Sequence, residues 1–343
     1  MEKIVVGMSG GLDSFVAALM LKEKGYEVVG AHLELWGADD LSEVGDICKK
    51  LEIPLVRCDG KELFRQVVVE GFVRGYLAAS TPSPCCTCNS YVKWQLLKKV
   101  ADERNIRLLA TGHYVRIAAR NGKYFVFKGI DANKDQSYFL WGVPQDILSR
   151  AVVPLGGFTK IEVKKLAAAW GYTQMVRKKE SMGICFLQGK NYRDFIREYV
   201  PDFRERKGAI VDRGGKIIGE HDGLLNYTVG QRQGLPCLNG RPMYVAQMDV
   251  ERNVLIADVK EGLQTMILWV GHTDVADPRD LQADDLQVKV RGIGLNPQKY
   301  VKEVTPVNNG LRILLSDPAW AVAPGQPVAF YRGERLVGGG LAM

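Results

Sequence analysis

The chain has 343 residues, of which 46% are hydrophobic and 25% charged, a composition typical of a globular protein of two or three domains. Its 46 Lys and Arg residues exceed its 39 Asp and Glu residues, and the net charge of +7 is compatible with a polyanionic partner. No run approaches the roughly 20 apolar residues of a membrane span. Seven cysteines behind a strand-like N-terminal run argue against a secreted disulfide framework. We therefore expect a cytoplasmic protein with no membrane partner.

The first half of the chain alternates strand-like runs with helical patterns. The strand-like runs lie at residues 4–8, 27–33, 54–58 and 108–111. The helical patterns lie at residues 13–24, 39–51, 61–77, 89–105 and about 143–179. This alternation predicts a parallel sheet covered by helices, with functional residues just after the carboxyl ends of the strands.

The second half is β-rich. Residues 208–234 abound in glycine and turn signals, and β-like runs follow at 243–248, 254–257, 266–270, 286–291, 311–315 and 328–332. Short strands with close turns favour small antiparallel barrels. The sequence thus predicts an α/β fold: a parallel-sheet catalytic domain at residues 1–187, a small β-rich domain at 188–265 and a β-barrel domain at 266–343.

A glycine-rich turn follows the first predicted strand, in Gly7-Met8-Ser9-Gly10-Gly11-Leu12-Asp13-Ser14. The glycine pair permits close backbone approach, and the N–H groups at the following helix start attract an anion. Ser9 and Ser14 add hydroxyl donors, and Asp13 could hold a Mg²⁺ ion. No Gly-Lys-Ser/Thr marks a Walker loop. The turn therefore predicts a phosphate site rather than a tight turn without a ligand.

This loop resembles the pyrophosphatase loop of the N-type ATP pyrophosphatases, the PP-loop superfamily. Such enzymes use ATP to adenylate an oxygen and release pyrophosphate, after which a nucleophile displaces AMP. The resemblance implies ATP and Mg²⁺ as cofactors. It covers amide-forming synthetases as well as tRNA thiolases, so the loop leaves the acceptor open.

Three thiols within four positions precede a predicted helix, in Thr81-Pro-Ser-Pro-Cys85-Cys86-Thr-Cys88-Asn89, and a further one lies in Ser181-Met-Gly-Ile-Cys185-Phe186. A helix start lowers a thiol pKa and favours a nucleophilic or metal-binding thiolate. Taken alone, Cys85-x-x-Cys88 fits zinc, redox and iron–sulfur sites. The other cysteines are expected to be small buried residues: Cys48, Cys58 and Cys237.

Together these blocks are similar to the tRNA-specific 2-thiouridylases, the MnmA/TrmU family, over nearly the whole chain. Further matching blocks are Ala110-Thr-Gly-His-Tyr114, Asp131-x-Asn-Lys-Asp-Gln-Ser-Tyr-Phe-Leu140, Gly219-Glu-His221, Gly230-Gln-Arg232 and Pro324-Gly-Gln326. The resemblance implies a tRNA sulfurtransferase that adenylates the C2 oxygen of the anticodon wobble uridine and replaces it with sulfur. It makes the first domain the PP-loop domain and the central domain a tRNA-binding one.

The resemblance also assigns roles to residues. Leu33 and Gly112 would lie near the nucleotide, and Asp13, Cys88 and Cys185 would be catalytic. In the usual family account Cys185 carries a persulfide whose sulfur reaches C2, and Cys88 then forms a disulfide with Cys185. The sulfur would come from a donor protein (a cysteine desulfurase or a sulfur relay) or from free sulfide.

Cys85 suggests a rival route, because many family members have Asp there. Cys85, Cys88 and Cys185 offer three thiolates that suit a [4Fe–4S] cluster with one open iron. That iron would deliver hydrosulfide without a protein persulfide. We favour the cluster over the persulfide, and structural zinc least of the three.

The expected substrate is an anticodon loop, because RNA loops are recognised through splayed-out bases that can enter a pocket. By the resemblance, Lys134, Asp135 and Gln136 form a tRNA-contacting loop; outside the family a polar surface loop would be the ordinary interpretation. The other residues implied in tRNA binding are Ser83, Pro84, Cys85, His113, Arg291 and Gln326.

The chain also departs from the usual family pattern. Gln233 stands where the family usually has Lys, and residues 236–240 replace a glycine-rich continuation. Two alternatives therefore stay open: a divergent PP-loop enzyme that thiolates or amidates another acceptor, and a non-catalytic tRNA-binding or iron–sulfur protein. Only the thiolase would use the phosphate loop, the cysteines and the barrel together.

Overall fold

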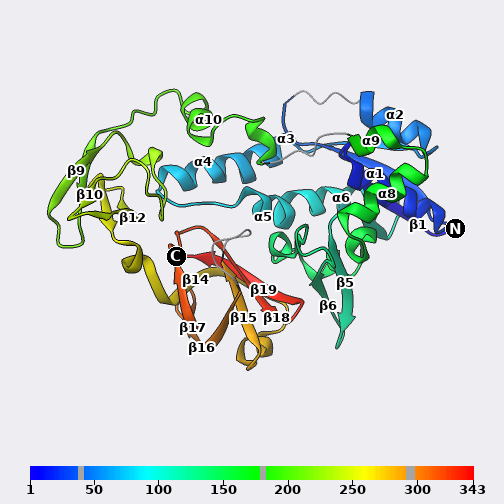
Figure 1. The fold of residues 1–343 in the computed structure, drawn as a ribbon. Helices are drawn as coiled ribbons and strands as arrows, with labels where there is room; N and C mark the ends of the chain where they lie inside the picture. The colour runs from blue at the N-terminus through cyan, green and yellow to red at the C-terminus, as the bar shows by residue number, and fades with distance from the viewer. Residues whose placement is uncertain (38–41, 178–182, 291–297) are drawn as a thin grey trace. The chain divides into compact units, whose positions relative to one another are not determined.

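The computed structural model describes residues 1–37, 42–177, 183–290 and 298–343 and divides into two compact units (Figure 1). Unit 1 comprises Met1–Val69, Cys85–Phe186 and Glu334–Gly338, and unit 2 comprises Glu70–Pro84, Leu187–Gly333 and Gly339–Met343. Among the described residues, no helix combines the length and the apolar character that crossing a membrane requires.

Unit 1 is built on a five-stranded sheet in the order β3-β2-β1-β4-β7, in which every pair is parallel. Its strands are β1 (Lys3–Gly7), β2 (Glu27–Glu34), β3 (Leu55–Asp59), β4 (Leu108–Ala110) and β7 (Ala151–Val152). The predicted parallel sheet is confirmed, whereas the two-residue strand β7 falls in a stretch predicted as helical. Because β1 lies between β2 and β4, the winding reverses there, and a crevice is expected at their carboxyl ends.

Helices cover this sheet. They are α1 (Leu12–Glu23), α2 (Ser42–Lys50), α3 (Lys61–Phe64), α5 (Pro84–Cys88), α6 (Trp94–Asp102), α7 (Gln145–Leu148), α8 (Lys160–Ala169) and α9 (Thr173–Arg177). Two π-helical turns, η1 (Arg65–Val69) and η2 (Asn89–Lys93), and three 3₁₀ turns, η3 (Ser137–Leu140), η4 (Pro154–Gly157) and η5 (Cys185–Leu187), complete the set.

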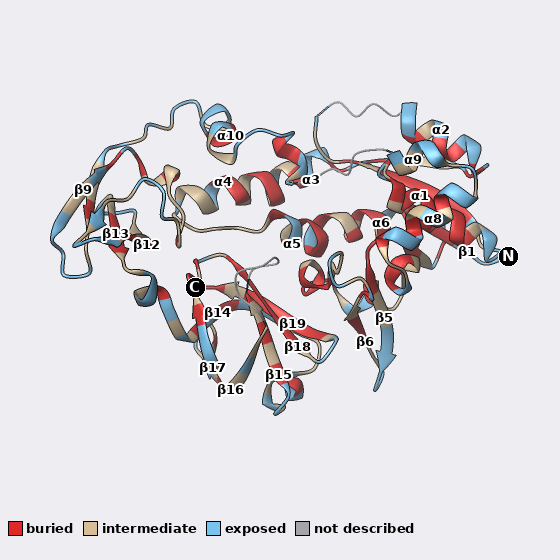
Figure 2. Cartoon of the chain, in the orientation of Figure 1, coloured by how far each residue is buried: buried red, intermediate tan, exposed pale blue. Residues whose placement is uncertain are grey.

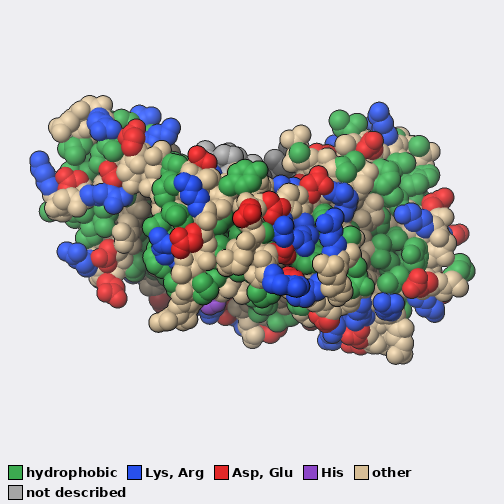
Figure 3. Space-filling view, turned by 90° about the horizontal axis from the view of Figure 1, so that it is seen from below, with side chains coloured by type: hydrophobic (Ala, Val, Ile, Leu, Met, Phe, Trp, Pro, Cys, Tyr) green, Lys and Arg blue, Asp and Glu red, His purple; other side chains and the backbone are tan. Residues whose placement is uncertain are grey.

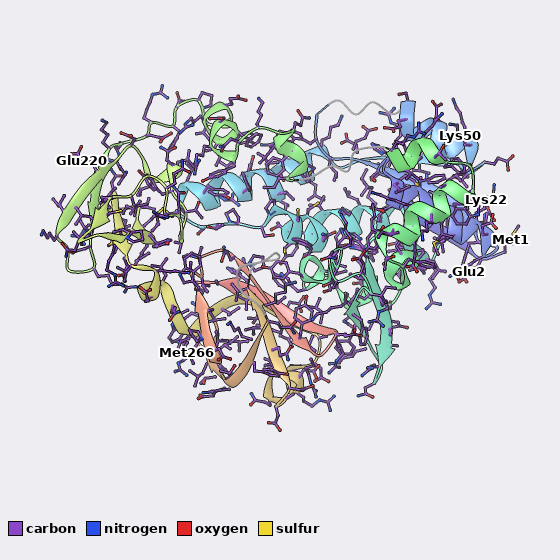
Figure 4. The ribbon with its side chains drawn as sticks, viewed as in Figure 1. Met1, Glu2, Lys22, Lys50, Glu220 and Met266 are labelled. Carbon is purple, nitrogen blue, oxygen red and sulfur yellow. The ribbon has the colours of Figure 1, made fainter. Side chains whose placement is uncertain are left out.

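The core of unit 1 surrounds α1, which packs against the sheet and α8. Nine of the twelve residues of α1 are buried, as the red of α1 in Figure 2 shows. At its end, the Lys22 ammonium (labelled in Figure 4) donates to the Leu51 carbonyl at 2.5 Å, which ties α1 to the end of α2. The helix that begins at the glycine-rich turn is therefore fixed along its length.

An antiparallel hairpin in unit 1, β5 (Val115–Arg120) and β6 (Lys123–Lys128), was not predicted. Its turn, Asn121-Gly122, has two positive φ angles, 50° and 74°, the signature of a tight hairpin turn. β6 also pairs with the start of β19 (Arg335–Ala342), with Leu336 opposite Val126.

Unit 2 contains α4 (Glu70–Leu77), α10 (Tyr192–Tyr199), the 3₁₀ turns η6 (Leu224–Asn226), η7 (Lys260–Leu263) and η8 (Pro278–Gln282), and two β-rich parts. The first part is a sheet in the order β12-β13-β8-β9, with the bounds β8 (Gly208–Val211), β9 (Ile217–His221), β12 (Tyr244–Asp249) and β13 (Val254–Asp258). A short pair accompanies it: β10 (Cys237–Leu238) and β11 (Arg241–Pro242).

The sheet is mostly antiparallel, as expected for this half of the chain, but its pair β8–β13 is parallel, which was not predicted. A parallel pair needs a long crossover connection, and residues 212–253 supply one between the two strands.

The second β-rich part confirms the predicted C-terminal barrel. Six strands follow the order β14-β17-β16-β15-β18-β19, and the pairing β14–β19 closes the ring. The remaining bounds are β14 (Gln264–Val275), β15 (Leu286–Val290), β16 (Lys299–Val307), β17 (Gly310–Trp320) and β18 (Pro327–Arg332). In β17 the side chains of Leu311, Ile313 and Leu315 alternate inward, as a closed barrel requires.

Candidate active site

A pocket of about 380 Å³ opens at the carboxyl ends of β1, β2 and β4. The residues after these strands meet there because parallel strands end at the same edge of a sheet. The lining residues are Gly7, Met8, Ser9, Asp13, Ser14, Ala31, His32, Leu33, Leu35, Lys93, Leu97, Thr111, Gly112, His113 and Gln136. Seven of the ten residues predicted to bind a nucleotide are among them.

The three others, Gly10, Gly11 and Leu12, belong to the same loop and the start of α1 but do not line the pocket. Gly10 has a φ of +74°, and a side chain there would press on Val44. Leu12 is buried at the start of α1. The Ser14 hydroxyl accepts from Ser9 N at 3.2 Å and donates to the Gly11 carbonyl at 3.0 Å, so the loop is closed by its own hydrogen bonds.

Gly112 touches this loop directly. A Cβ atom at Gly112 would lie 2.7 Å from the carbonyl carbon of Asp13 and 3.0 Å from the amide nitrogen of Ser14. Only glycine allows such an approach of two backbones. The strand β4 therefore supports the glycine-rich turn through the residues that follow it.

Asp13 is held by two partners from elsewhere in the chain. Lys160 donates to both carboxylate oxygens, at 2.7 and 2.8 Å, and the Tyr114 hydroxyl donates to Oδ1 at 2.7 Å. Lys160 is the first residue of α8 and is buried. The carboxylate predicted to hold Mg²⁺ thus already has a resident cation.

His113 lies in the pocket as a neutral imidazole. Burial lowers its pKa to about 3, and the nearby Lys93 ammonium adds to this shift. Its Nδ1 atom lies 2.7 Å from the Thr111 hydroxyl oxygen, and its ring stacks on Trp94 at 5.8 Å between centroids. The structure therefore places this residue, predicted near the tRNA, in the same pocket as the residues predicted to bind a nucleotide.

The three predicted active cysteines are neighbours in unit 1. Cys185 lies about a hundred residues further along the chain, yet it is close enough for its charge to raise the pKa of both Cys85 and Cys88. Cys85 and Cys185 are exposed, and Cys88 is buried. Cys86 is buried too, with its thiol 3.8 Å from the Tyr138 carbonyl, which fits a packing role.

The cysteines expected to be small buried residues divide into two groups. Cys48 and Cys58 are buried, as predicted. Cys237 is exposed, so the prediction is wrong for this residue. It is the first residue of the two-residue strand β10.

The expectation of lowered thiol pKa values is wrong. Desolvation by the surrounding protein raises the pKa of all three thiols, even though the residues Cys85 and Cys185 keep exposed surface, and the pKa of the buried Cys88 reaches about 11. The thiols of Cys85 and Cys88 lie within the short helix α5 rather than ahead of a long one, so desolvation outweighs the helix end. The Lys93 ammonium opposes the shift at all three thiols.

The predicted [4Fe–4S] cluster concerns the same three thiols, Cys85, Cys88 and Cys185. In the part of the chain that the structure describes, no three His, Cys, Asp or Glu side chains group closely enough to hold a metal ion. The structure therefore does not confirm the cluster, which stays a prediction.

An aromatic cluster fixes Cys185. The next residue, Phe186, is buried, and its ring packs edge-on against Phe64 at 5.9 Å and Trp36 at 6.1 Å. Cys185 thus sits exposed beside a firm anchor, although residues 178–182 before it lie outside the described part.

The predicted RNA-contacting loop of unit 1 is held by its own bonds. Asp135 accepts from Gly129 N, Ser137 N and the Ser137 hydroxyl, at 2.8–3.2 Å. Gln136 accepts from Tyr114 N at 2.9 Å and lines the pocket. Lys134 is half-buried on the same loop.

The other predicted RNA contacts differ in accessibility. Ser83 is half-buried and Pro84 buried. Gln326 in unit 2 is only 4% exposed, and its Oε1 accepts from Ala323 N at 3.1 Å, so it shapes a barrel loop. Arg291 lies outside the described residues.

Sequence reasoning missed Lys93, Lys160, Tyr114 and Thr111 as site residues. The pattern around Lys160 showed only an amphipathic helix, and its partner Asp13 lies 147 positions away. Thr111 and Tyr114 stand in the quoted block Ala110–Tyr114, so their place beside Gly112 and His113 was the available signal.

Three protein-family models match the chain in order. They are the tRNA methyl transferase HUP domain at residues 2–189, the tRNA methyl transferase PRC-barrel domain at residues 193–258, and the Aminomethyltransferase beta-barrel domain at residues 269–342. The first of them alone covers more than half of the chain.

Curated relatives match over almost their full length. The chain is 38% identical to tRNA-specific 2-thiouridylase MnmA 2 of Phocaeicola vulgatus, with 99% of this chain and 97% of the relative covered. It is 39% identical to tRNA-specific 2-thiouridylase MnmA of Heliobacterium modesticaldum, with 99% and 92% covered. For the enzyme of the same name from Cytophaga hutchinsonii, identity is 35%, with 98% and 96% covered. The chain therefore belongs to the tRNA-specific 2-thiouridylase family.

Proposed function

We propose that this chain is an ATP-dependent tRNA 2-thiouridylase that replaces the C2 oxygen of the anticodon wobble uridine with sulfur. The observation that carries the proposal concerns Lys93. This residue lines the pocket of the phosphate loop, and its positive charge also lowers the pKa of the thiols of Cys85, Cys88 and Cys185. Activation by ATP and delivery of sulfur would then occur side by side. Methyl transfer, named in the matching family models, needs no phosphate activation of its acceptor.

In the first step the C2 oxygen attacks the α-phosphorus of ATP, and pyrophosphate leaves. The N–H groups at the start of α1 and the hydroxyls of Ser9 and Ser14 would hold the phosphates. Leu33 and Gly112 would flank the rest of the nucleotide, and Mg²⁺ would reach the phosphates beside Asp13. Adenylation turns the oxygen into part of a good leaving group, AMP.

In the second step the terminal sulfur of a Cys185 persulfide attacks C2, and AMP leaves. The Cys88 thiolate then attacks the sulfur of Cys185, which breaks the bond to the transferred sulfur and leaves a Cys88–Cys185 disulfide. A two-electron thiol reductant restores both thiols. The outer sulfur of the Cys185 persulfide would come as sulfane sulfur from a donor protein, a cysteine desulfurase or a sulfur relay. Free sulfide would form the same persulfide by attacking Cys185 in the Cys88–Cys185 disulfide, with the Cys88 thiolate as leaving group.

For the tRNA we propose contacts from both units. Lys134, Asp135, Gln136 and His113 would lie near the activated base, and Ser83, Pro84 and Cys85 would flank it. Arg291 and Gln326 would serve the barrel domain as RNA contacts, with Gln326 acting through the loop that it shapes. On the face in Figure 3, Lys and Arg side chains are interspersed with Asp and Glu. We therefore expect specific contacts to matter more than one basic field there.

The domain roles and the location follow from this chemistry. Residues 1–187 would activate the base, residues 188–265 would bind tRNA, and residues 266–343 would hold the anticodon region. A cytoplasmic enzyme is expected because its substrates, ATP and tRNA, are found there.

Cysteine variants and iron analysis test the sulfur route. Protein purified without oxygen would be analysed for iron and acid-labile sulfide and assayed for 2-thiouridine with ATP, Mg²⁺, tRNA and a persulfide donor or sulfide. The persulfide route predicts loss of activity in Cys88→Ser and Cys185→Ser, retention in Cys85→Ser, and no effect of the control Cys237→Ser.

Two results would change the account. About four irons per chain, with activity lost in Cys85→Ser, would replace the persulfide by a [4Fe–4S] cluster. Absence of thiolation under every condition, with ATP still cleaved to AMP, would point to another acceptor, such as one that is amidated. Absence of both activities would favour a tRNA-binding protein.

A further inference from the structure

The Asp13 carboxylate is the one acidic group among the residues that line the described pocket. Its side chain is 36% exposed, whereas the side chain of its partner Lys160 is 9% exposed. The carboxylate thus faces the pocket on one side and a buried ammonium on the other. This buried lysine has no role in the activation steps described above.

An unpaired carboxylate at this position would oppose the function of the loop. Asp13 is the second residue of α1, whose start attracts anions through its N–H groups. A negative charge within the same turn would repel the phosphates of a nucleotide, since like charges at close range disfavour one another. A cation bound to Asp13 removes that repulsion.

The structure holds the Lys160 side chain at this place. A capping box of Thr159 and Glu162 fixes the first turn of α8, with Glu162 N donating to the Thr159 hydroxyl at 3.3 Å. The backbone N–H of Lys160 donates to Asp131 Oδ2 at 2.9 Å. Its ammonium also lies 5.7 Å from the centre of the Tyr114 ring. Helix start, backbone and aromatic neighbour therefore all fix where the positive charge lies.

We propose that Lys160 is a positioning residue of the nucleotide site: its ammonium neutralises and orients Asp13, so that a polyphosphate meets a phosphate loop without net negative charge. The inference rests on the proposed function, because it takes the pocket to be a nucleotide site. Tyr114 has the auxiliary part of fixing Oδ1.

The same contacts bear on magnesium. Both carboxylate oxygens of Asp13 accept hydrogen bonds from Lys160. A metal ion that used Asp13 would first have to displace the ammonium, so nucleotide binding is expected to depend on Lys160 even without Mg²⁺.

The test is a charge-compensation cycle on the full chain. Affinity for a non-hydrolysable ATP analogue would be measured by calorimetry, with Mg²⁺ and with a chelator, for the wild type, Lys160→Met, Lys160→Arg, Asp13→Asn and the double variant Asp13→Asn/Lys160→Met. The matched control is Lys165→Met, an exposed lysine on the same helix. Thermal unfolding of each variant reports its fold.

Lys160→Met is expected to bind the analogue about 10- to 100-fold more weakly, because it leaves a lone carboxylate in the loop. Lys160→Arg should keep most of the affinity, and Lys165→Met all of it. The double variant should bind within about threefold of Asp13→Asn alone, since the neutral amide that replaces the carboxylate no longer needs a cation. This last comparison holds even if Lys160→Met fails to fold.

Wild-type affinity in Lys160→Met, or a double variant much weaker than Asp13→Asn, would overturn the inference while leaving the nucleotide site in place. Failure of the wild type to bind the analogue would overturn the proposed function and this inference with it.

Discussion

At Cys88 two opposing effects set the pKa of the thiol. Burial raises it to about 11, and the Lys93 ammonium lowers it by less than burial raises it. A raised pKa means that the thiol keeps its proton at neutral pH, so it is a poor nucleophile until something alters its surroundings. The positive charge of Lys93 thus favours the thiolate form of Cys88.

Replacing Lys93 by Met should therefore slow the alkylation of Cys88. In iron-free protein at about pH 9 we expect the rate with iodoacetamide to fall about three- to tenfold, because losing an opposite charge raises the pKa by up to about one unit. In the wild type the rate should rise with pH toward the pKa of about 11. Mass spectrometry of the Cys88 peptide gives the rate.

The control for this prediction is Lys98→Met on α6, which removes a lysine paired with Asp102 and Asp146. An unchanged rate in Lys93→Met, or an equal fall in Lys98→Met, would show that Lys93 has no particular effect on Cys88.

His113 gives a pH dependence of stability. Its pKa is lowered from 6.5 to about 3, so below pH 6.5 the unfolded chain takes up a proton that the folded chain does not. The contribution of this residue to the free energy of unfolding is therefore fully present above pH 6.5 and is lost as the pH falls from 6.5 toward 3. At about pH 5 the loss is about 2 kcal/mol.

His113→Gln should remove about this part of the difference in unfolding free energy between about pH 7.5 and about pH 5. Urea denaturation at the two pH values measures it, and the exposed His272→Gln serves as control. If His113→Gln and the wild type lose the same stability on acidification, the residue is not the buried neutral group described here.

At the scale of elements, the proposed nucleotide site depends on two backbone segments in contact. The chain after β4 reaches the loop before α1 at Gly112, where a Cβ atom would lie 2.8 Å from the Asp13 carbonyl oxygen. Loop and strand end must therefore shift together if either changes.

Gly112→Ala should cost about 1–3 kcal/mol of stability through this overlap and weaken ATP binding at least about tenfold. Gly157→Ala is the matched control, because a Cβ atom there meets no atom within 4 Å. Calorimetric titration with an ATP analogue measures the affinity. Wild-type affinity in Gly112→Ala would contradict the prediction, because it would mean that the loop makes room for the methyl group without weakening nucleotide binding.

The segment α5–η2–α6 shows why some of the site escaped sequence reasoning. Its helical pattern was predicted for residues 89–105, but the π-helical turn Asn89–Lys93 was not, because no composition signal marks it. Lys93 stands at the end of that turn, between the pocket and the thiols. Its position depends on this irregular turn, so a regular helical pattern could not place it.

At the scale of the whole molecule, the strands of the parallel sheet were predictable from sequence, whereas some strands with exposed side chains were not. The predicted runs for β1 to β4 gave bounds within one residue. In β1, β2 and β4 the reason is that both faces of a parallel sheet are covered, so that such strands are largely apolar. The strand β16 was missed because most of its residues are partly or fully exposed. The hairpin β5–β6 was missed although Asn121-Gly122 marks its turn.

The residues of the candidate site also differ in how far the sequence could predict them. Residues close together in a motif, such as Ser9 to Ser14 or Thr111 to His113, could be predicted because one strand end carries them. Lys160 could not, since its pairing with Asp13 depends on how α8 packs against α1. Long-range ion pairs follow from packing rather than from local pattern.

The most direct test of the account is the stoichiometry of the overall reaction. Purified protein, wobble-uridine tRNA, ATP, Mg²⁺ and a persulfide donor would be combined, and 2-thiouridine, AMP and pyrophosphate would be measured together. The account predicts equal amounts of all three products and none when ATP is omitted. Thiolation without formation of AMP, or AMP formed with no sulfur on the wobble uridine, would contradict it.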